Sequence, residues 1–279
     1  MSLPARCFSK MHGAGNDFVV LDLRQGQRPP SIDEARLMAD RRRGIGCDQL
    51  LTIEPPTTAG AVAAYRIWNA DGSAAGQCGN GARCVAAWLV RDGSASGERF
   101  TLDSPAGPIG VEALADGSFR LDMGRPRFAP ADVPLVMPLE RPLYSVDSPF
   151  GELHFGAVSM GNPHAVIEVA SVDEAQVADI GRWLQGSSWF PEGINVGFAQ
   201  RLSPDAIRLR VFERGAGETL ACGSGACAAV AVLVRQGRIG RSASVALPGG
   251  ELRIDWPDDA APLSMAGPAA FVFEGEWKP

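Results

Sequence analysis

Lysine is scarce in this chain. Only two of its 26 basic residues are lysines, Lys10 and Lys278. A pyridoxal phosphate enzyme holds its cofactor through a lysine in a packed pocket. Neither lysine suits that task, because Lys278 is the penultimate residue and Lys10 precedes a glycine turn. We therefore expect no pyridoxal phosphate chemistry.

The usual metal ligands are also few. The chain has three histidines, and its six cysteines do not show the close C-x-x-C pairs that are typical of zinc sites. We expect no metal. The cysteines should be reduced thiols if the protein is cytosolic.

Long apolar runs are missing as well. No run of 18 apolar residues occurs, and the first ten residues, MSLPARCFSK, lack the apolar core of a signal peptide. The expectations are no membrane partner and a cytoplasmic location. The net charge is −6, and the one basic cluster is Arg41 to Arg43. A nucleic-acid partner is therefore not expected, since such surfaces are usually basic.

An internal repeat is the most informative feature present. NADGSAAGQCGNGARCVAAWLVRDG, from Asn69, aligns without a gap with ERGAGETLACGSGACAAVAVLVRQG, from Glu213, at an offset of 144. Cys78 falls on Cys222. Two copies of one unit predict a pseudo-symmetric pair of lobes. The expected division is an N-terminal lobe at 1–127, with the C-terminal strand as a candidate addition to it, a crossover at 128–149 and a C-terminal lobe at 150–279.

Each half alternates short strand patterns with two helical patterns. Helices are expected at 32–42, 80–91, 173–185 and 224–235, and the second and fourth are apolar nearly all round, which is typical of a buried helix. The fold class that follows is α+β: in each lobe a mostly antiparallel, barrel-like sheet wraps around a central buried helix. The active site is expected in the cleft between the lobes.

The repeated motif places a thiol at the start of each buried helix. Asn80 and Ser224 are suitable N-cap residues, and the first amides of a helix bind anions such as a carboxylate. A helix N-terminus also favours the thiolate form of cysteine. If the lobes face each other, Cys78 and Cys222 flank one molecule, and one removes a proton while the other delivers one to the opposite face. This two-base inversion needs no cofactor.

Six motifs in this order resemble those of diaminopimelate epimerases: MHGAGNDF, GIGCDQLL, NADGSAAGQCGNGARC, SMGNPH, INVGF and FERGAGETLACGSGACA. The resemblance covers the whole chain. It implies inversion at one α-carbon of LL-diaminopimelate to give the meso form, in lysine and peptidoglycan-precursor synthesis, by a homodimer. It also implies that Cys78 and Cys222 are catalytic and that His164 and Glu213 tune the thiols. The substrate contacts that it implies are Asn16, Gln49, Asn69, Gly79, Asn80, Asn162, Asn195, Glu213, Arg214, Gly223 and Ser224.

These residue types suit a substrate with two ammonium and two carboxylate groups. Side-chain amides both donate and accept hydrogen bonds. Arg214 suits a second carboxylate, and Glu213 suits an ammonium. Three alternatives stay open: a racemase of proline-type amino acids, a cofactor-independent isomerase of another acid, and a redox sensor or binding protein in which Cys78 and Cys222 form a switch disulfide.

Overall fold

The computed structural model describes residues 5–76 and 78–278. The chain divides into two compact units. The first contains the described residues up to Asp122 together with those from Gly267 onward, and the second contains Met123–Ala266. The stretch 128–149, expected as a crossover, lies within the second unit.

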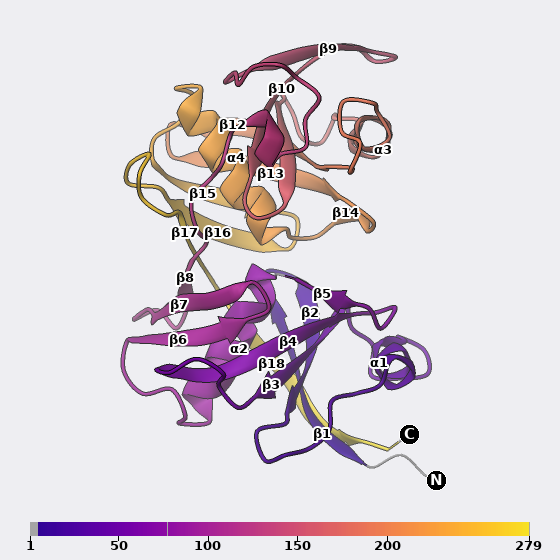
Figure 1. Cartoon of the computed structure of the whole chain (residues 1–279), viewed down its shortest axis with the longest axis vertical. Helices are drawn as coiled ribbons and strands as arrows, with labels where there is room; N and C mark the ends of the chain where they lie inside the picture. The colour runs from indigo at the N-terminus through magenta and orange to yellow at the C-terminus, as the bar shows by residue number, and fades with distance from the viewer. Residues whose placement is uncertain (1–4, 77, 279) are drawn as a thin grey trace. The chain divides into compact units, whose positions relative to one another are not determined.

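The first unit is one mixed sheet with two helices (Figure 1). Strand β18 pairs antiparallel with β1, β1 with β2, β3 with β4, β6 with β7, and β7 with β8. The pairs β2–β3 and β4–β6 are parallel. The elements are β1 (Arg6–Gly13), β2 (Asn16–Asp22), α1 (Ile32–Ala39), β3 (Gln49–Glu54), β4 (Ala61–Asn69), β5 (Ala74–Ala75), α2 (Gly79–Arg91), β6 (Arg99–Ser104), β7 (Gly107–Ala113), β8 (Phe119–Asp122) and β18 (Ala270–Trp277).

The second unit repeats this order of pairings. Strand β9 pairs antiparallel with β10, β10 with β11, β12 with β13, β15 with β16, and β16 with β17, whereas β11–β12 and β13–β15 are parallel. The elements are η1 (Pro130–Asp132), β9 (Tyr144–Ser148), β10 (Gly151–Ser159), β11 (Pro163–Glu168), α3 (Val177–Gln185), β12 (Asn195–Ser203), β13 (Ala206–Glu213), β14 (Gly217–Thr219), α4 (Gly223–Arg235), β15 (Ser242–Leu247), β16 (Gly250–Asp255) and β17 (Ser264–Gly267).

Each helix lies where two neighbouring strands run parallel. A parallel pair needs a crossover connection, usually a helix, and α1 and α2 in the first unit correspond to α3 and α4 in the second. Helix α2 contacts β1, β2, β3 and β8, and α4 contacts β10, β11, β12, β13 and β16. Each sheet therefore curves around its helix. The helices and mixed sheets confirm the expected α+β class. Within the described residues no pairing joins β8 to β18, so the first sheet stays open instead of closing into a barrel.

Small side chains let the sheets approach the two central helices. A Cβ atom on Gly81 of α2 would lie 3.1 Å from a methyl group of Leu51, and one on Gly225 of α4 would lie 3.1 Å from Val211. Both are tighter than ordinary van der Waals contacts. The alanine- and glycine-rich sequences of α2 and α4 therefore allow a dense fit that larger residues would disturb.

Two helix boundaries differ from the predictions by more than one residue. The helix expected at 32–42 starts at Ile32, because Ser31 and Glu34 form a capping box, but it ends at Ala39, since Asp40 has an extended backbone. The helix expected at 173–185 begins only at Val177. Among the residues that the structure describes, no helix is long and apolar enough to cross a lipid bilayer.

Candidate active site

Cys78 lies at the N-terminus of α2 and is itself the N-cap. Its backbone is extended, with φ −151° and ψ 105°, and its Sγ accepts a hydrogen bond from the backbone N–H of Gly81 over 3.4 Å. The prediction that Asn80 caps this helix is wrong, because Asn80 is already helical. Its side chain instead turns inward, where Asn80 is only 2% exposed.

The Asn16 side chain reaches this helix end from the start of β2. Its Oδ1 accepts from the Cys78 thiol over 3.6 Å and from Nδ2 of Asn80 over 3.3 Å. On the next two strands, Gln49 and Asn69 are cross-strand partners, and Nε2 of Gln49 donates to Oδ1 of Asn69 over 2.9 Å. The first unit thus brings four of the predicted amides to neighbouring strand and helix ends.

Cys222 is the N-cap of α4, in the equivalent place of the second unit. The prediction of Ser224 as cap is wrong for the same reason as for Asn80: the helix already begins at Gly223. Cys222 is 5% exposed, and its thiol donates to Oε2 of Glu213 over 3.0 Å. Burial raises the pKa of Cys222 well above its ordinary value, and the negative charge of Glu213 raises it further. This cysteine is therefore a thiol in the structure.

Glu213 is held in place by a second contact. Its other oxygen, Oε1, accepts from the Thr219 hydroxyl over 2.5 Å. In the repeat, Glu213 takes the position of Asn69, so that a carboxylate in one unit corresponds to a neutral amide in the other. The two thiols therefore have different surroundings despite the shared fold.

His164 lies on β11 and is fully buried beside the start of α4. Its Nε2 is 3.0 Å from Oδ1 of Asn162 and 3.1 Å from the Ser224 hydroxyl, and Nδ2 of Asn162 also donates to that hydroxyl over 3.2 Å. Burial, and to a lesser extent the charge of Arg214, lower the pKa of His164 to about 3. The imidazole is neutral at pH 7, and it reaches Cys222 only through Ser224, whose hydroxyl lies 3.6 Å from the thiol.

Asn195 and Arg214 join two strand ends. Oδ1 of Asn195 accepts from the backbone N–H of Arg214, and Nδ2 of Asn195 donates to the carbonyl of Pro163, each over 2.9 Å. The Arg214 side chain is exposed, and one guanidinium nitrogen donates to the Glu192 carbonyl over 2.9 Å. Asn195 therefore fixes the backbone from which Arg214 projects.

All predicted site residues lie in the described part of the chain, and they form two groups. The first unit holds Cys78 with Asn16, Gln49, Asn69, Gly79 and Asn80, and the second holds Cys222 with Asn162, His164, Asn195, Glu213, Arg214, Gly223 and Ser224. Sequence reasoning missed Asp48, which contacts Asn16, and Thr219, which contacts Glu213. The available signal for Asp48 was its place beside Gln49 in the motif GIGCDQLL.

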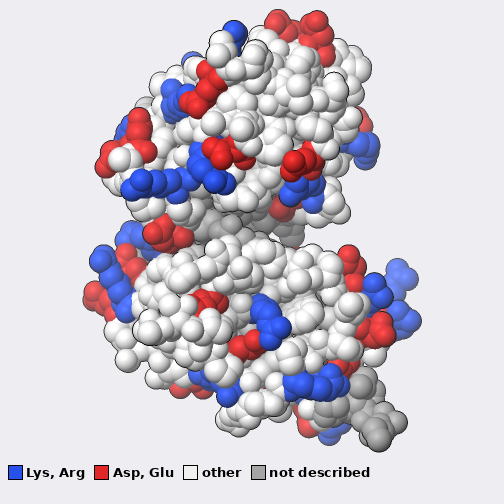
Figure 2. Space-filling view, viewed as in Figure 1, with Lys and Arg blue, Asp and Glu red and all other residues white. Residues whose placement is uncertain are grey.

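The surface seen in Figure 2 carries basic and acidic side chains in alternation over each unit. Many charged side chains of the two units form ion pairs, such as Arg66 with Glu54 and Arg210 with Glu218. The two arginines lie on equivalent strands, β4 and β13. Paired surface charges of this kind leave no large region of one sign on the visible face.

The family model described as diaminopimelate epimerase matches residues 8–129 and 156–272. A diaminopimelate epimerase from Xanthomonas axonopodis pv. citri is 60% identical over 271 residues, which cover 97% of this chain and 95% of that protein. An O-ureido-serine racemase from Streptomyces lavendulae is also 60% identical, over 270 residues that cover 96% of this chain and 94% of that protein.

Solved structures show the same fold at low identity. A hydroxyproline epimerase from Agrobacterium vitis superposes with a TM-score of 0.70 at 16% identity, covering 100% of this chain and 94% of that one. A probable proline racemase from Agrobacterium radiobacter gives 0.68 at 18% identity, covering 97% and 92%. At such identities the likeness concerns the fold alone.

Proposed function

Because the chain belongs to the diaminopimelate epimerase family, we propose that it interconverts LL- and meso-diaminopimelate, with Cys78 and Cys222 as the paired base and acid. One observation carries the assignment of the pair: both cysteines are N-caps of equivalent buried helices in units of the same topology. A symmetric task, removal and delivery of one proton on opposite faces of a carbon, suits two equivalent thiols.

In the proposed reaction, one cysteine acts as thiolate and takes the α-proton, so that its S–H bond forms as the C–H bond breaks. The electron pair spreads into the substrate carboxylate. The N–H groups of Gly79, Asn80, Gly223 and Ser224, at the two helix N-termini, are suited to stabilise that charge. The other cysteine gives its proton to the opposite face and is left as thiolate. Exchange with solvent restores the starting state.

Glu213 sets the order of these steps. Cys222 is a thiol because of its burial and of the carboxylate beside it, so it is the proton donor in the resting enzyme. When Cys222 must instead act as base, Glu213 is placed to receive the thiol proton across their 3.0 Å hydrogen bond. His164 contributes through Ser224 as a neutral hydrogen-bonding group, since its low pKa excludes a charged form at pH 7.

The remaining predicted residues are proposed as substrate contacts. Asn16, Asn69, Gln49 and Asn162 present amides that suit both ammonium and carboxylate groups. Arg214 is exposed and suits the carboxylate of the distal amino-acid head, which monofunctional amino acids lack.

The cellular context is proposed from the chemistry. None of the six cysteines, all of which lie in the described residues, forms a disulfide. The cytoplasm keeps thiols reduced, which a thiol-dependent enzyme of lysine and peptidoglycan-precursor synthesis requires.

We further propose a homodimer. Val272 and Phe273 of β18 are 55% and 48% exposed, and a second copy of the chain would cover such apolar residues. Light scattering on the purified protein measures the oligomeric state.

The proposed activity is tested with dialysed protein and no added cofactor or metal. We expect meso-diaminopimelate to form from the LL form, as measured by chiral chromatography. Activity that vanishes on dialysis and returns only with pyridoxal phosphate would contradict it.

O-ureido-serine racemisation is a second candidate, favoured by the 60% identity to the racemase of that name. The same assay with O-ureido-L-serine and with L-proline separates the candidates. We expect kcat/KM to be highest for diaminopimelate, and the reverse order would assign the chain to the other reaction.

A further inference from the structure

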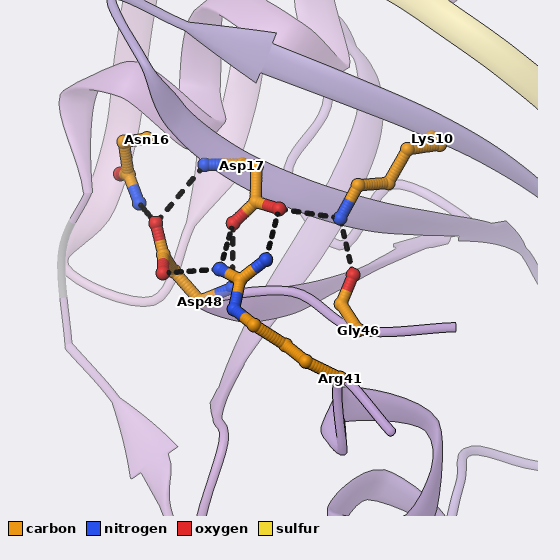
Figure 3. A network of polar contacts seen from close by, with 6 residues as sticks. All are labelled: Lys10, Asn16, Asp17, Arg41, Gly46 and Asp48. Atoms are coloured by element: carbon orange, nitrogen blue, oxygen red, sulfur yellow. Dashed lines mark hydrogen bonds and ion pairs between the residues drawn. The ribbon is translucent and has the colours of Figure 1, made fainter. Parts of the chain in front are cut away.

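A charged network lies behind the Asn16 side chain in the first unit (Figure 3). Nδ2 of Asn16 donates to Oδ2 of Asp48 over 2.9 Å. Arg41 bridges the two carboxylates of the network, donating to Oδ1 of Asp48 over 2.8 Å and to both oxygens of Asp17 over 2.7 and 2.9 Å. Lys10, which is 7% exposed, donates to Oδ2 of Asp17 over 2.5 Å.

Asp17 and Asp48 also fix each other through the backbone. The N–H of Asp17 donates to the Asp48 carboxylate over 3.1 Å, and the N–H of Asp48 donates to the Asp17 carboxylate over 2.9 Å. Burial alone would raise the pKa of Asp17, but hydrogen bonds from Arg41 and Lys10 outweigh it and hold the pKa far below its ordinary value. Asp17 is therefore charged at any pH of interest, and Asp48 has little freedom to move.

On its other side, Asn16 continues a directed chain of hydrogen bonds. Its Oδ1 accepts from Nδ2 of Asn80, and Oδ1 of Asn80 accepts from the guanidinium of Arg83 over 2.9 Å. A guanidinium only donates and a carboxylate only accepts. Arg83 at one end and Asp48 at the other thus allow one orientation of both amides, in which the Asn16 oxygen faces Cys78.

The second unit lacks this arrangement. Asn162 occupies the position equivalent to Asn16, yet its Nδ2 donates to Ser224 and its Oδ1 lies against His164. Asn195 begins β12 as Gln49 begins β3. The residue before Asn195 is Ile194, whereas the residue before Gln49 is Asp48. The orientation of the amide next to Cys78 is therefore a property of the first unit and is held by Asp48 together with Arg83, which acts through Asn80.

We propose that Asp48 is a positioning residue, which holds the Asn16 amide with its oxygen toward the Cys78 thiol, and that Arg41 and Asp17 hold Asp48 for this purpose. The proposal deepens the proposed function, since it concerns the same catalytic cysteine. An acceptor oxygen 3.6 Å from Sγ favours the thiol over the thiolate. The same oxygen accepts from the Cys78 thiol and from the Asn80 amide, so a substrate ammonium that binds there displaces the thiol from the oxygen, and Cys78 can then act as the base.

The variant Asp48→Asn removes one of the two constraints on the Asn16 amide. A carboxamide at position 48 offers one acceptor and one donor in place of two acceptors, so only the Asn80 side still opposes the reversed orientation, in which the Asn16 NH₂ group faces Cys78 and stabilises a thiolate. The measurement is the pH dependence of iodoacetamide alkylation of Cys78 without substrate, with the Cys78 peptide quantified by mass spectrometry. We expect the profile to move to lower pH, with alkylation at pH 7 faster by on the order of tenfold, as for one added donor to an anion.

A double-mutant cycle separates this effect from the loss of a nearby charge. In an Asn16→Ala background, Asp48→Asn should leave the alkylation profile unchanged. The matched control is Asp40→Asn, which removes a carboxylate that binds Arg43 and the turn after α1 and that is expected to leave the profile as in the wild type. Tyr65 and Cys84 also interact with Cys78, but burial raises the pKa of each, so both stay protonated through the range of the assay.

A profile that does not move in Asp48→Asn overturns the proposal, and so does a shift that persists undiminished in the Asn16→Ala background. If Asp48→Asn fails to fold, Arg41→Gln loosens Asp48 without removing it and should give a smaller shift in the same direction. No substrate enters the alkylation assay. A failure of the proposed function would therefore appear in the turnover of wild-type protein, independently of this result.

Discussion

The thiol of Cys222 lies 3.0 Å from Oε2 of Glu213 and donates a hydrogen bond to it. In the other half of the repeat, Asn69 replaces the carboxylate and Asn16 presents an amide oxygen to Cys78. The two halves therefore share one topology, but the surroundings of their thiols differ. The reaction runs in both directions across one carbon, so both thiols must serve as acid and as base. The different surroundings affect only how each thiol gains or loses its proton.

Glu213→Gln should lower the activity and also make Cys222 easier to ionise. The carboxylate charge raises the pKa of Cys222, after burial, so that its removal lowers that pKa. The variant also loses the group that receives the thiol proton, and we expect kcat to fall by about 10²-fold or more. Glu218→Gln is the matched control, because Glu218 pairs with Arg210 away from the thiol. Unchanged turnover in Glu213→Gln would exclude this part of the mechanism.

Substitution of four of the six cysteines should separate chemistry from packing. Cys78→Ala and Cys222→Ala are each expected to abolish epimerisation with the fold intact. Cys84 and Cys227 are fully buried within α2 and α4, and their alanine variants should retain turnover and lose about 1 kcal/mol of unfolding free energy. Chemical denaturation and a chiral assay on the four variants check both statements. Wild-type rates in either of the first two would refute the pairing of the thiols.

His164 should make stability depend on pH below neutrality. The folded protein protonates this residue only at about pH 3, whereas the unfolded chain does so at its ordinary value of 6.5. The unfolded state therefore binds the extra proton between these values, and stability falls by about 1.4 kcal/mol per pH unit below 6.5. From pH 7 to pH 5, wild type should lose about 2 kcal/mol more than His164→Gln in urea unfolding. His154→Gln, at an exposed site, should behave as wild type.

Arg214→Lys tests the choice of a substrate with two amino-acid heads. Lysine keeps the charge but loses the planar fork that binds a carboxylate. We expect kcat/KM for diaminopimelate to fall on the order of tenfold to a hundredfold. Arg210→Lys is the control, since Arg210 pairs with Glu218 on the same pair of strands. Equal kcat/KM of the variant and wild type would remove Arg214 from the substrate site.

The repeat made the fold class and the two helix-end thiols predictable, because a helix start with flanking glycines has a clear sequence pattern. The cap residues were predicted wrongly: serine and asparagine are better caps than cysteine by propensity, but the extended backbone falls at Cys78 and Cys222. Asp48 could not be found from its spacing. Its contact with Asn16 joins positions 32 residues apart and exists only because β2 and β3 pair in parallel.

In the proposed mechanism, two thiols act on opposite faces of one carbon. The most direct measurement is the early turnover of LL-diaminopimelate by wild-type enzyme in D₂O, with deuterium at the α-carbon quantified separately in substrate and product. The two-base mechanism predicts that the meso product carries solvent deuterium from the first turnovers while the recovered LL substrate carries almost none, because the proton is removed by one thiol and replaced by another. Deuterium that enters the LL substrate as fast as the meso product would indicate a single base and contradict this mechanism.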